Sequence, residues 1–436
     1  MVNVGKIYSA LGNSDSLFPL AVKDISATAG MTAGSFVTGK EEGQDRFIDE
    51  IGTEVIWLCG LPFSKWAFDK TIFKWIGFDS KFDARNFNQN KNILKKIKEY
   101  APTQEIKSGI ENISKNEAFF KNIVATKFVL TTALTVGSYI GLTRFKQKFT
   151  ENKIRENLIL EHNKKQETTK ESSTNNVSFK GIGPLAESFA FSPVKNMWIL
   201  DGAITAERLK DSRSPQEFVG YGIKEASTLL FMYYFGDKIQ GLLEKQSIKK
   251  HNKSIGLDAR VLEHNFLKKA FEDKSIIKDL EDFNKISNSD TDIYEFLFKN
   301  PDNAIVKASK KSEIVKMYKN PSKKWGFLGI QKKTAMIDTR SFIDIDKIKN
   351  VNKELTMLYE QYKTALSSGE TSDEFFTTLR KLKRNSIRTN IGSCILALGV
   401  VTPAIMLAKR LYGKDNQEFQ TKKEIREQMI KEGLIA

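Results

Sequence analysis

Two glutamates are the acids in this sequence whose placement favours ion chemistry. Glu54 and Glu225 each stand directly before a short apolar run, Val55 to Phe63 and Ala226 to Phe235 respectively. A carboxylate in such a place either caps a helix N-terminus or faces a partner in a polar seam between helices. The helix cap or an exposed position is the simpler interpretation. A symmetric proton or cation site, with a possible transport role for both acids, is the alternative.

The other motifs that resemble catalytic or metal sites are incomplete. Gly34 to Glu41 has the glycine and lysine spacing of a phosphate-binding loop, but Glu41 replaces the magnesium-binding hydroxyl and no hydrophobic strand comes before it. The acids around Asp290 resemble the start of a calcium loop, but Ile293 occupies the place of the required glycine. The three histidines have no ligand neighbours at metal-site spacing. The sequence therefore predicts no catalytic residue, cofactor or metal.

A basic segment with aromatic residues extends over positions 307–333, where nine lysines accompany a single acid, Glu313. Its centre is an apolar tip between lysine pairs. The expected lipid contacts there are Lys323, Lys324, Trp325, Phe327, Lys332 and Lys333. Rings at such a tip can insert into a membrane while each ammonium group gains about 1 kcal/mol from anionic lipid. A solvated loop with a packed tryptophan is the plainer alternative, and nucleic acid is the less expected partner because no zinc finger, RNP or helix-turn-helix signature is present.

Two long apolar segments are the elements expected to position these groups. Residues 389–408 contain no charge, and a helix of twenty residues reaches roughly 30 Å, the thickness of a bilayer core. Residues 123–142 form a second candidate that is interrupted only by Lys127. Both are predicted to cross a membrane, with a pair of core helices in a soluble bundle as the alternative. The shorter runs at 55–63 and 226–235 are predicted to be interfacial or re-entrant, and aromatic residues interleaved with lysines make Trp66 and Trp75 further expected lipid contacts.

The chain also matches itself in a series of short segments that keep their order. Asp83-Ala84-Arg85 recurs at Asp258-Ala259-Arg260, and Ile154-Arg155-Glu156 resembles Ile425-Arg426-Glu427. We interpret this as an internal duplication, with an N-terminal segment 1–16, repeat A over 17–162, a flexible polar linker over 163–180 and repeat B over 181–436. Repeat B is expected to carry a soluble helical insertion at 274–385.

Composition sets the remaining expectations. The net charge of +16 favours an anionic partner, and a mean hydropathy of −0.37 implies that much of the chain lies in water. The expected fold is a predominantly α-helical integral membrane protein made of two related copies. Its expected function is to tether a basic helical module to an anionic membrane, with a possible protein partner. A small transporter or pore at the repeat interface, or a membrane-bound enzyme without a recognisable motif, is the alternative. Richness in lysine and asparagine suggests a bacterial protein of the cytoplasmic membrane.

Overall fold

The computed structural model describes residues 4–13, 16–162, 191–212, 215–325, 330–412 and 420–434. The predicted linker at 163–180 lies outside these residues. The fold is predominantly helical, as predicted. The chain divides into two compact units that interleave along the sequence. Unit 1 contains residues 1–16, 68–125 and 238–390, whereas unit 2 contains residues 17–67, 126–237 and 391–436. Each of the ranges predicted as repeat A and repeat B therefore contributes to both units.

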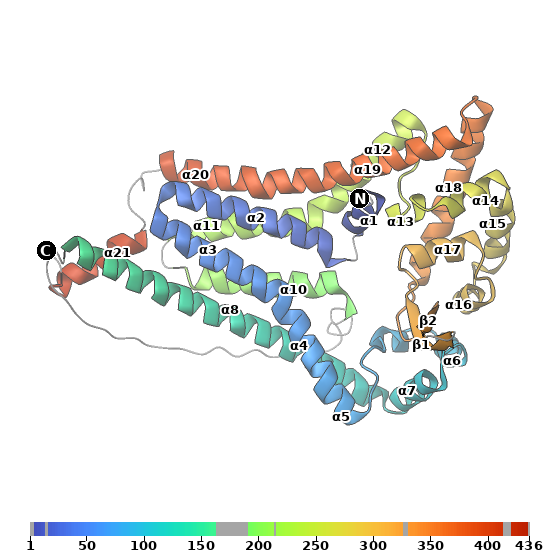
Figure 1. The fold of residues 1–436 in the computed structure, drawn as a ribbon, viewed down its shortest axis with the longest axis horizontal. Helices are drawn as coiled ribbons and strands as arrows, with labels where there is room; N and C mark the ends of the chain where they lie inside the picture. Colours follow the sequence, from blue (N-terminus) through green and yellow to red (C-terminus); the bar gives the residue numbers. More distant parts are fainter. Residues whose placement is uncertain are drawn as a thin grey trace. The chain divides into compact units, whose positions relative to one another are not determined.

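Unit 2 consists of long helices whose axes run roughly parallel in Figure 1. Its α-helical segments are α2 (Leu17–Thr38), α3 (Lys40–Val55), most of α4 (Leu61–Phe68), α8 (Glu117–His162) from residue 126, α10 (Pro193–Lys210), α11 (Pro215–Leu229), the end of α19 (Ser372–Leu396), α20 (Thr402–Tyr412) and α21 (Gln420–Lys431). Three π-helical segments continue these helices: η1 (Ile56–Gly60), η4 (Leu230–Tyr234) and η5 (Ala397–Val401). Helix α2 packs against α3, η5 and α20, and α10 packs against α11.

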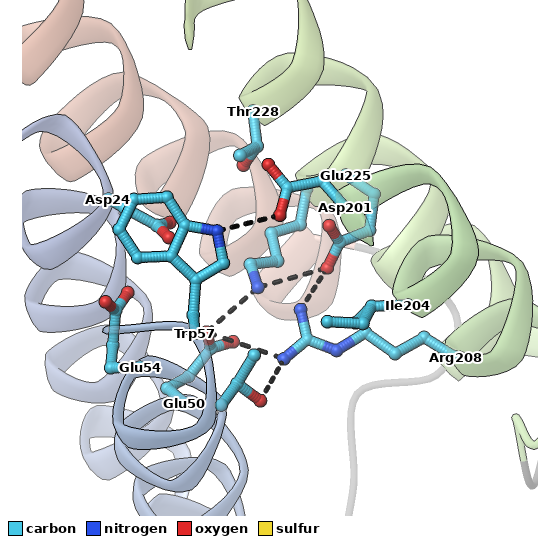
Figure 2. A pocket seen from close by; sticks show the side chains of 11 residues that line it. Asp24, Glu50, Glu54, Trp57, Asp201, Ile204, Arg208, Glu225 and Thr228 are labelled. Carbon is cyan, nitrogen blue, oxygen red and sulfur yellow. Dashed lines mark hydrogen bonds and ion pairs between the residues drawn. The ribbon is translucent and has the colours of Figure 1, made fainter. Parts of the chain in front are cut away.

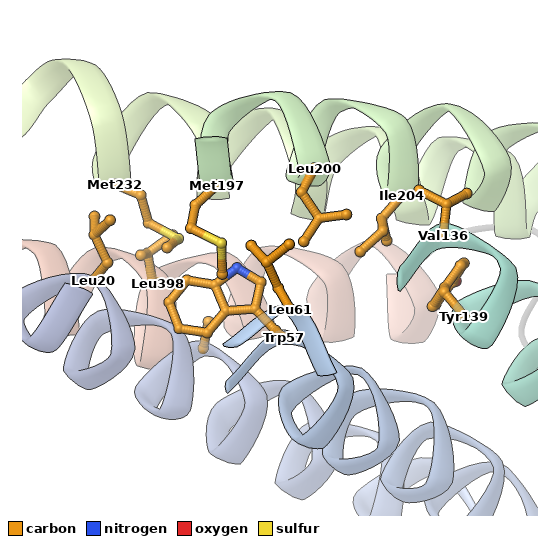
Figure 3. Close-up of a cluster of buried hydrophobic side chains, with 11 residues drawn as sticks. Leu20, Trp57, Leu61, Val136, Tyr139, Met197, Leu200, Ile204, Met232 and Leu398 are labelled. Atoms are coloured by element: carbon orange, nitrogen blue, oxygen red, sulfur yellow. The ribbon is translucent and has the colours of Figure 1, made fainter. Parts of the chain in front are cut away.

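An apolar cluster holds the centre of unit 2 together, and Figure 3 shows it between helices from distant parts of the sequence. Its largest member is Trp57, which is 1% exposed. Around this ring lie Leu20, Ala27, Leu61, Val136, Tyr139, Met197, Leu200, Ile204, Met232 and Leu398. Nearby, α2 and η5 approach closely because both lack a side chain at their contact: a Cβ at Gly30 would overlap the carbonyl oxygen of Gly399. Small residues at such crossings are typical of packed membrane helices.

Both predicted long apolar segments are helical. Residues 123–142 lie within α8, and residues 389–408 continue from the end of α19 through η5 into α20. Both helices are long and apolar enough to cross a membrane, and only 39% and 28% of their most apolar windows are buried. The shorter runs at 55–63 and 226–235 are not isolated helices, since each continues a longer helical segment through η1 or η4.

Unit 1 is formed by shorter helices. They are α1 (Val4–Leu11), η2 (Asp69–Phe73), α5 (Lys74–Ile76), η3 (Ala84–Asn88), α6 (Lys91–Glu99), α7 (Gln104–Lys115), the start of α8, most of α12 (Phe235–His251), α13 (Ala259–Leu262), α14 (Asn265–Glu272), α15 (Ser275–Ile286), α16 (Asp290–Lys299), α17 (Ala304–Lys311), α18 (Ile345–Ser367) and α19 up to residue 390. Side-chain caps fix several of their starts, as where Thr103 accepts from the amide of Ile106. Buried aromatic rings fill its core, with Phe271 in edge contact with Tyr359 and Phe376.

The prediction that the insertion at 274–385 is wholly helical is wrong in one place. Strands β1 (Met317–Trp325) and β2 (Ile330–Ile337) form an antiparallel hairpin inside it. The register shifts between Asn320 and Lys323, where the sequence places Pro321. Proline lacks the amide proton that a helix or an inner strand needs, and it is tolerated at bulges. The many lysines concealed this strand pattern in the sequence.

Candidate functional site

Unit 2 buries many charged side chains in its interior. The buried charged residues of unit 2 are the acids Asp45, Asp49, Glu50, Glu54 and Glu225 and the bases Lys23, Lys146, Arg208 and Lys224. Asp24, Arg46 and Asp201 are partly buried beside them. Lys, Glu, Arg and Asp are almost never fully buried unless they are paired. This concentration marks the interior of unit 2 as the candidate functional site.

Helix α3 supplies most of the acids because of their spacing. Asp49 and Glu50 are adjacent, and each lies four or five residues from Asp45 on one side and from Glu54 on the other. This spacing places the four acids on one face of a helix. The same helix begins with Lys40, Glu41 and Glu42, so its composition is that of a surface helix. The structure nevertheless turns the acidic face inward.

At one end of the site, cations from α10 and α11 neutralise this face. The ammonium group of Lys224 lies 2.9 Å from Glu50 Oε2 and 3.0 Å from Glu225 Oε1. Arg208 pairs closely with Glu225, lies 3.5 Å from Asp49 Oδ2, and donates to the hydroxyl of Tyr139 at 2.9 Å. Each buried cation therefore meets more than one acceptor, the arrangement in which a buried ion pair is tolerated.

Further along α3, helix α8 contributes Lys146 to the same network. Its ammonium group lies 3.8 Å from Asp45 Oδ2 and 3.7 Å from Asp49 Oδ1, and Thr150 donates to Asp45 at 2.7 Å. Lys146 also donates to the hydroxyl of Tyr221, 3.3 Å away. The charged interior therefore extends over several helical turns.

At the other end, three carboxyl groups lack a cation within 4.0 Å in the part of the chain that the structure describes: Asp24, Glu54 and Asp201. The hydrogen-bond donors to Glu54 and Asp201 are neutral side chains. Thr28 donates to Glu54 Oε1 at 2.9 Å, while Trp57 donates to Asp201 Oδ1 at 3.1 Å and Tyr233 donates to Asp201 Oδ2. The second oxygen of Glu54, Oε2, is buried without a hydrogen-bond partner.

A cavity of about 30 Å³ connects the two ends, and Figure 2 shows the side chains around it facing one another from α2 and α3 on one side and α10 and α11 on the other. Its lining residues are Asp24, Glu50, Thr53, Glu54, Trp57, Asp201, Ile204, Arg208, Lys224, Glu225 and Thr228. The first five lie within residues 17–162 and the rest within residues 181–436. The volume is sufficient for a water molecule.

The structure brings the two predicted acids together, since Glu54 and Glu225 both line this cavity. Neither stands at a helix N-terminus: Glu54 is the second-last residue of α3, and Glu225 lies inside α11. The helix-cap interpretation is therefore wrong, because each short apolar run continues a helix that began earlier. The polar-seam alternative describes the observed environment of both acids.

The predicted lipid contacts lie in other places. Trp66 and Trp75 are 56% and 86% exposed. Lys323, Lys324 and Trp325 lie on β1, and Lys332 and Lys333 lie on β2, with Lys323 opposite Lys332 in the register. Phe327 lies outside the described residues.

Sequence reasoning missed the basic half of the site. Lys224 and Arg208 look like ordinary surface charges, and Asp24 marks the end of an apolar run. The available signal was a single charge inside an apolar run, as at Asp201 between Leu200 and Gly202. No group of acids, histidines or cysteines suited to a metal ion occurs among the residues that the structure describes. Cys59 and Cys394 form no disulfide with each other, and Cys59 is exposed.

Unit 1 contains a smaller polar cluster of a different kind. The hydroxyl of Ser254 lies 3.1 Å from Glu244 Oε1 and 2.9 Å from Glu354 Oε2, and it can donate to only one of them. A side chain at Gly256 would collide with both carboxyl groups. Burial raises the pKa of Glu354 and the neighbouring Glu244 raises it further, although the hydrogen bond from Ser254 acts in the opposite direction. This acid pair favours one retained proton.

The comparisons with known proteins gave no match to any family model, curated protein or solved structure. The chemistry that the site can perform is therefore inferred from its geometry alone. The site holds an ordered series of acids and bases, a water-sized cavity and neutral hydroxyl donors. This arrangement can bind or relay protons or a small cation.

Proposed function

We propose that this chain is an integral membrane protein in which unit 2 lies in the bilayer and carries a small cation or protons across it. The observation that supports this is the reversed polarity of unit 2. It contains 25 of the 32 large apolar side chains that are exposed among the described residues, and it also contains the buried charge network. Apolar surface of that extent on a soluble protein would be an aggregation liability, whereas lipid would cover it favourably.

The exposed apolar surface includes the candidate spans. Leu134 on α8 is 61% exposed, and Leu396, Val400 and Ile405 along α19, η5 and α20 are 56%, 56% and 52% exposed. These exposed apolar side chains suit the lipid surroundings that the sequence predicts for both long segments. A simple anchor would need this surface but no charged interior.

The buried charges favour transport over anchoring alone. Moving a carboxylate or an ammonium group out of water costs several kcal/mol even after relaxation, so such groups inside membrane proteins usually serve an ion or substrate path. In unit 2 they extend from Lys146 past Glu225 to Glu54 and Asp24. The same groups line the seam between the two sequence copies, where transporters built from repeats bind their substrates.

The packing in unit 2 supports the duplication on which this seam depends. Ile154 and Leu158 at the end of α8 pack against Ile425 and Met429 of α21. The alignment of the two copies pairs Ile154 with Ile425 and Leu158 with Met429, so corresponding residues contact one another. A twofold relation between related halves produces contacts of this kind.

Two measurements test the proposal. Membrane fractions of cells that express the full chain should retain it after a carbonate wash and release it only in detergent. Purified protein in liposomes with a trapped pH dye or cation dye should then dissipate an imposed gradient. The paired variant Lys224→Met/Glu225→Gln should lose at least tenfold of this flux while it resists carbonate extraction. Glu99→Gln, an exposed acid of unit 1, is the matched control and should retain the wild-type rate.

A tether is the second candidate, and the exposed rings of Trp66 and Trp75 favour it. In that case unit 2 would anchor unit 1 to an anionic membrane, and the basic hairpin would contribute to lipid binding. The liposome experiment separates the two functions. A tether predicts carbonate resistance with no flux above protein-free liposomes, and binding of unit 1 surfaces to anionic vesicles that depends on Lys323 and Lys332.

A further inference from the structure

We infer that the Asp24, Glu54 and Asp201 end of the unit 2 cavity is a proton-binding site, so that protons are the ions that the site takes up and releases. This inference rests on the proposed function, because it names the ion for the same site. It also stands on three observations of its own, which concern the charge balance, the hydrogen bonds and the geometry of the acids.

The first observation is an excess of acids. Among the described residues, the charged interior contains seven carboxyl groups, which are Asp24, Asp45, Asp49, Glu50, Glu54, Asp201 and Glu225, and five bases, which are Lys23, Arg46, Lys146, Arg208 and Lys224. Full ionisation of these described groups would leave two more negative than positive charges in a low-dielectric interior. Such groups take up protons in preference to remaining charged.

The second observation is where the uncompensated acids lie. Glu50 and Glu225 share Lys224 and Arg208, so the excess falls on the three acids at the other end. Glu54 lines the cavity and is 8% exposed, and its Oε2 atom is buried without a hydrogen-bond partner. A proton on this oxygen would give it a donor to offer to a water molecule in the cavity or to the nearby carboxyl group of Asp24.

The surroundings of Glu54 determine how readily the proton leaves. The charged groups that line the cavity with it are Asp24 from α2, Asp201 and Arg208 from α10, Lys224 and Glu225 from α11, and Glu50 on its own helix. Acids outnumber bases in this set, and Lys224 is already engaged by Glu50 and Glu225. Thr28 is the one hydroxyl that donates to Glu54 itself among the described residues.

The third observation separates a proton from a metal ion. Ca²⁺ takes six to eight oxygen ligands at close range, and Mg²⁺ needs six. Asp201 already accepts from Trp57 and Tyr233 on both of its oxygens, and no three acids in the described part of the chain converge as a metal site. A proton needs only one carboxyl oxygen and an acceptor within reach.

Infrared titration of the full chain in lipid nanodiscs tests the inference. The wild-type protein should keep a protonated-carboxyl stretching band near neutral pH, and Glu54→Gln should remove intensity equal to one carboxylic acid per chain. Glu99→Gln should leave the band unchanged. Thr28→Val keeps the carboxyl group and removes its donor, so the band should persist and its titration midpoint should rise. This second variant also shows that the effect does not depend on loss of folding.

Two results would overturn the inference. One is a wild-type spectrum without the band, or a band that survives in Glu54→Gln, Asp24→Asn and Asp201→Asn alike. The other is disappearance of the band on addition of Na⁺ at constant pH, which would identify a metal cation as the ligand. Ion flux without the carboxylic-acid band would refute the proton-binding inference and leave the transport proposal standing. The band without ion flux would support the proton-binding site and refute transport.

Discussion

Unit 1 and unit 2 distribute polarity in opposite ways within one chain. Among the described residues, unit 1 packs aromatic rings such as Phe271 and Phe376 in its interior, exposes seven large apolar side chains and buries four charged groups, whereas unit 2 exposes 25 and buries nine. Both units are helical. The difference teaches that helix content and total hydrophobicity do not determine which surroundings suit a domain. The placement of the charged side chains, inside the domain or on its surface, is the more informative feature.

The largest expected effect comes from breaking the buried charge pair in unit 2. Lys224→Met leaves Glu50 and Glu225 without their shared cation, and we expect it to destabilise the protein by about 3–5 kcal/mol. Chemical unfolding in mild detergent, followed by circular dichroism, measures this change.

The paired variant sharpens that result. Lys224→Met/Glu225→Gln removes one charge of each sign, so its loss of stability should be at least twofold smaller than that of the single variant. Equal losses from the single and the paired variants would mean that packing, and not charge, determines the stability of this region.

Placing a charge on the outer faces compares the two units directly. Leu134→Lys puts an ammonium group on the exposed face of α8 in unit 2, which should cost roughly 2.5–3.5 kcal/mol if that face contacts lipid. Leu366→Lys, on an exposed position of α18 in unit 1, should change stability by less than about 0.5 kcal/mol. The readouts are carbonate resistance and unfolding in lipid. Equal, small effects would place unit 2 in water.

The glycine contact between α2 and η5 gives a smaller effect. Gly30→Ala adds the methyl group that would overlap the carbonyl oxygen of Gly399, and we expect a loss of about 1–3 kcal/mol in unfolding free energy. Gly137→Ala is the control, since open space surrounds that position on α8 and alanine favours helices. Its stability should stay the same or rise by up to about 1 kcal/mol.

The acid pair of unit 1 should give the smallest effect, visible only as a change with pH. Because the pKa of Glu354 is raised in the folded state, its contribution to stability is full below the unfolded pKa of about 4.3 and is lost as pH rises through the folded value. Glu354→Gln should flatten the fall in stability over this range. Glu360→Gln, on an exposed position of the same helix, should leave the slope unchanged. Parallel slopes in both variants would show that Glu354 holds no extra proton.

Particular residues show what the sequence predicted and what it left out. The long helices were predictable because twenty uncharged residues before Lys409 leave few other solutions, and Glu54 and Glu225, which stand before similar apolar runs, line one cavity. The interleaving of two units was not predictable, because pairwise packing such as that of Gly30 on Gly399 depends on shape that composition does not encode. Lys224 and Arg208 escaped notice because a charge on an amphipathic helix gives the same pattern whether its partner is water or a buried carboxylate.

The π-helical segments of unit 2 have a mechanical consequence. Segments η1 and η4 each accommodate one residue more than an α-helix would, and they present Trp57 and Tyr233, the two donors to Asp201. One residue of an α-helix corresponds to about 100° of rotation. Migration of such a widened turn would swing either ring away from the acid while the helix kept its length and its ends. A shift of a π-helical segment by one residue would therefore break a hydrogen bond to Asp201 through rotation of the helix.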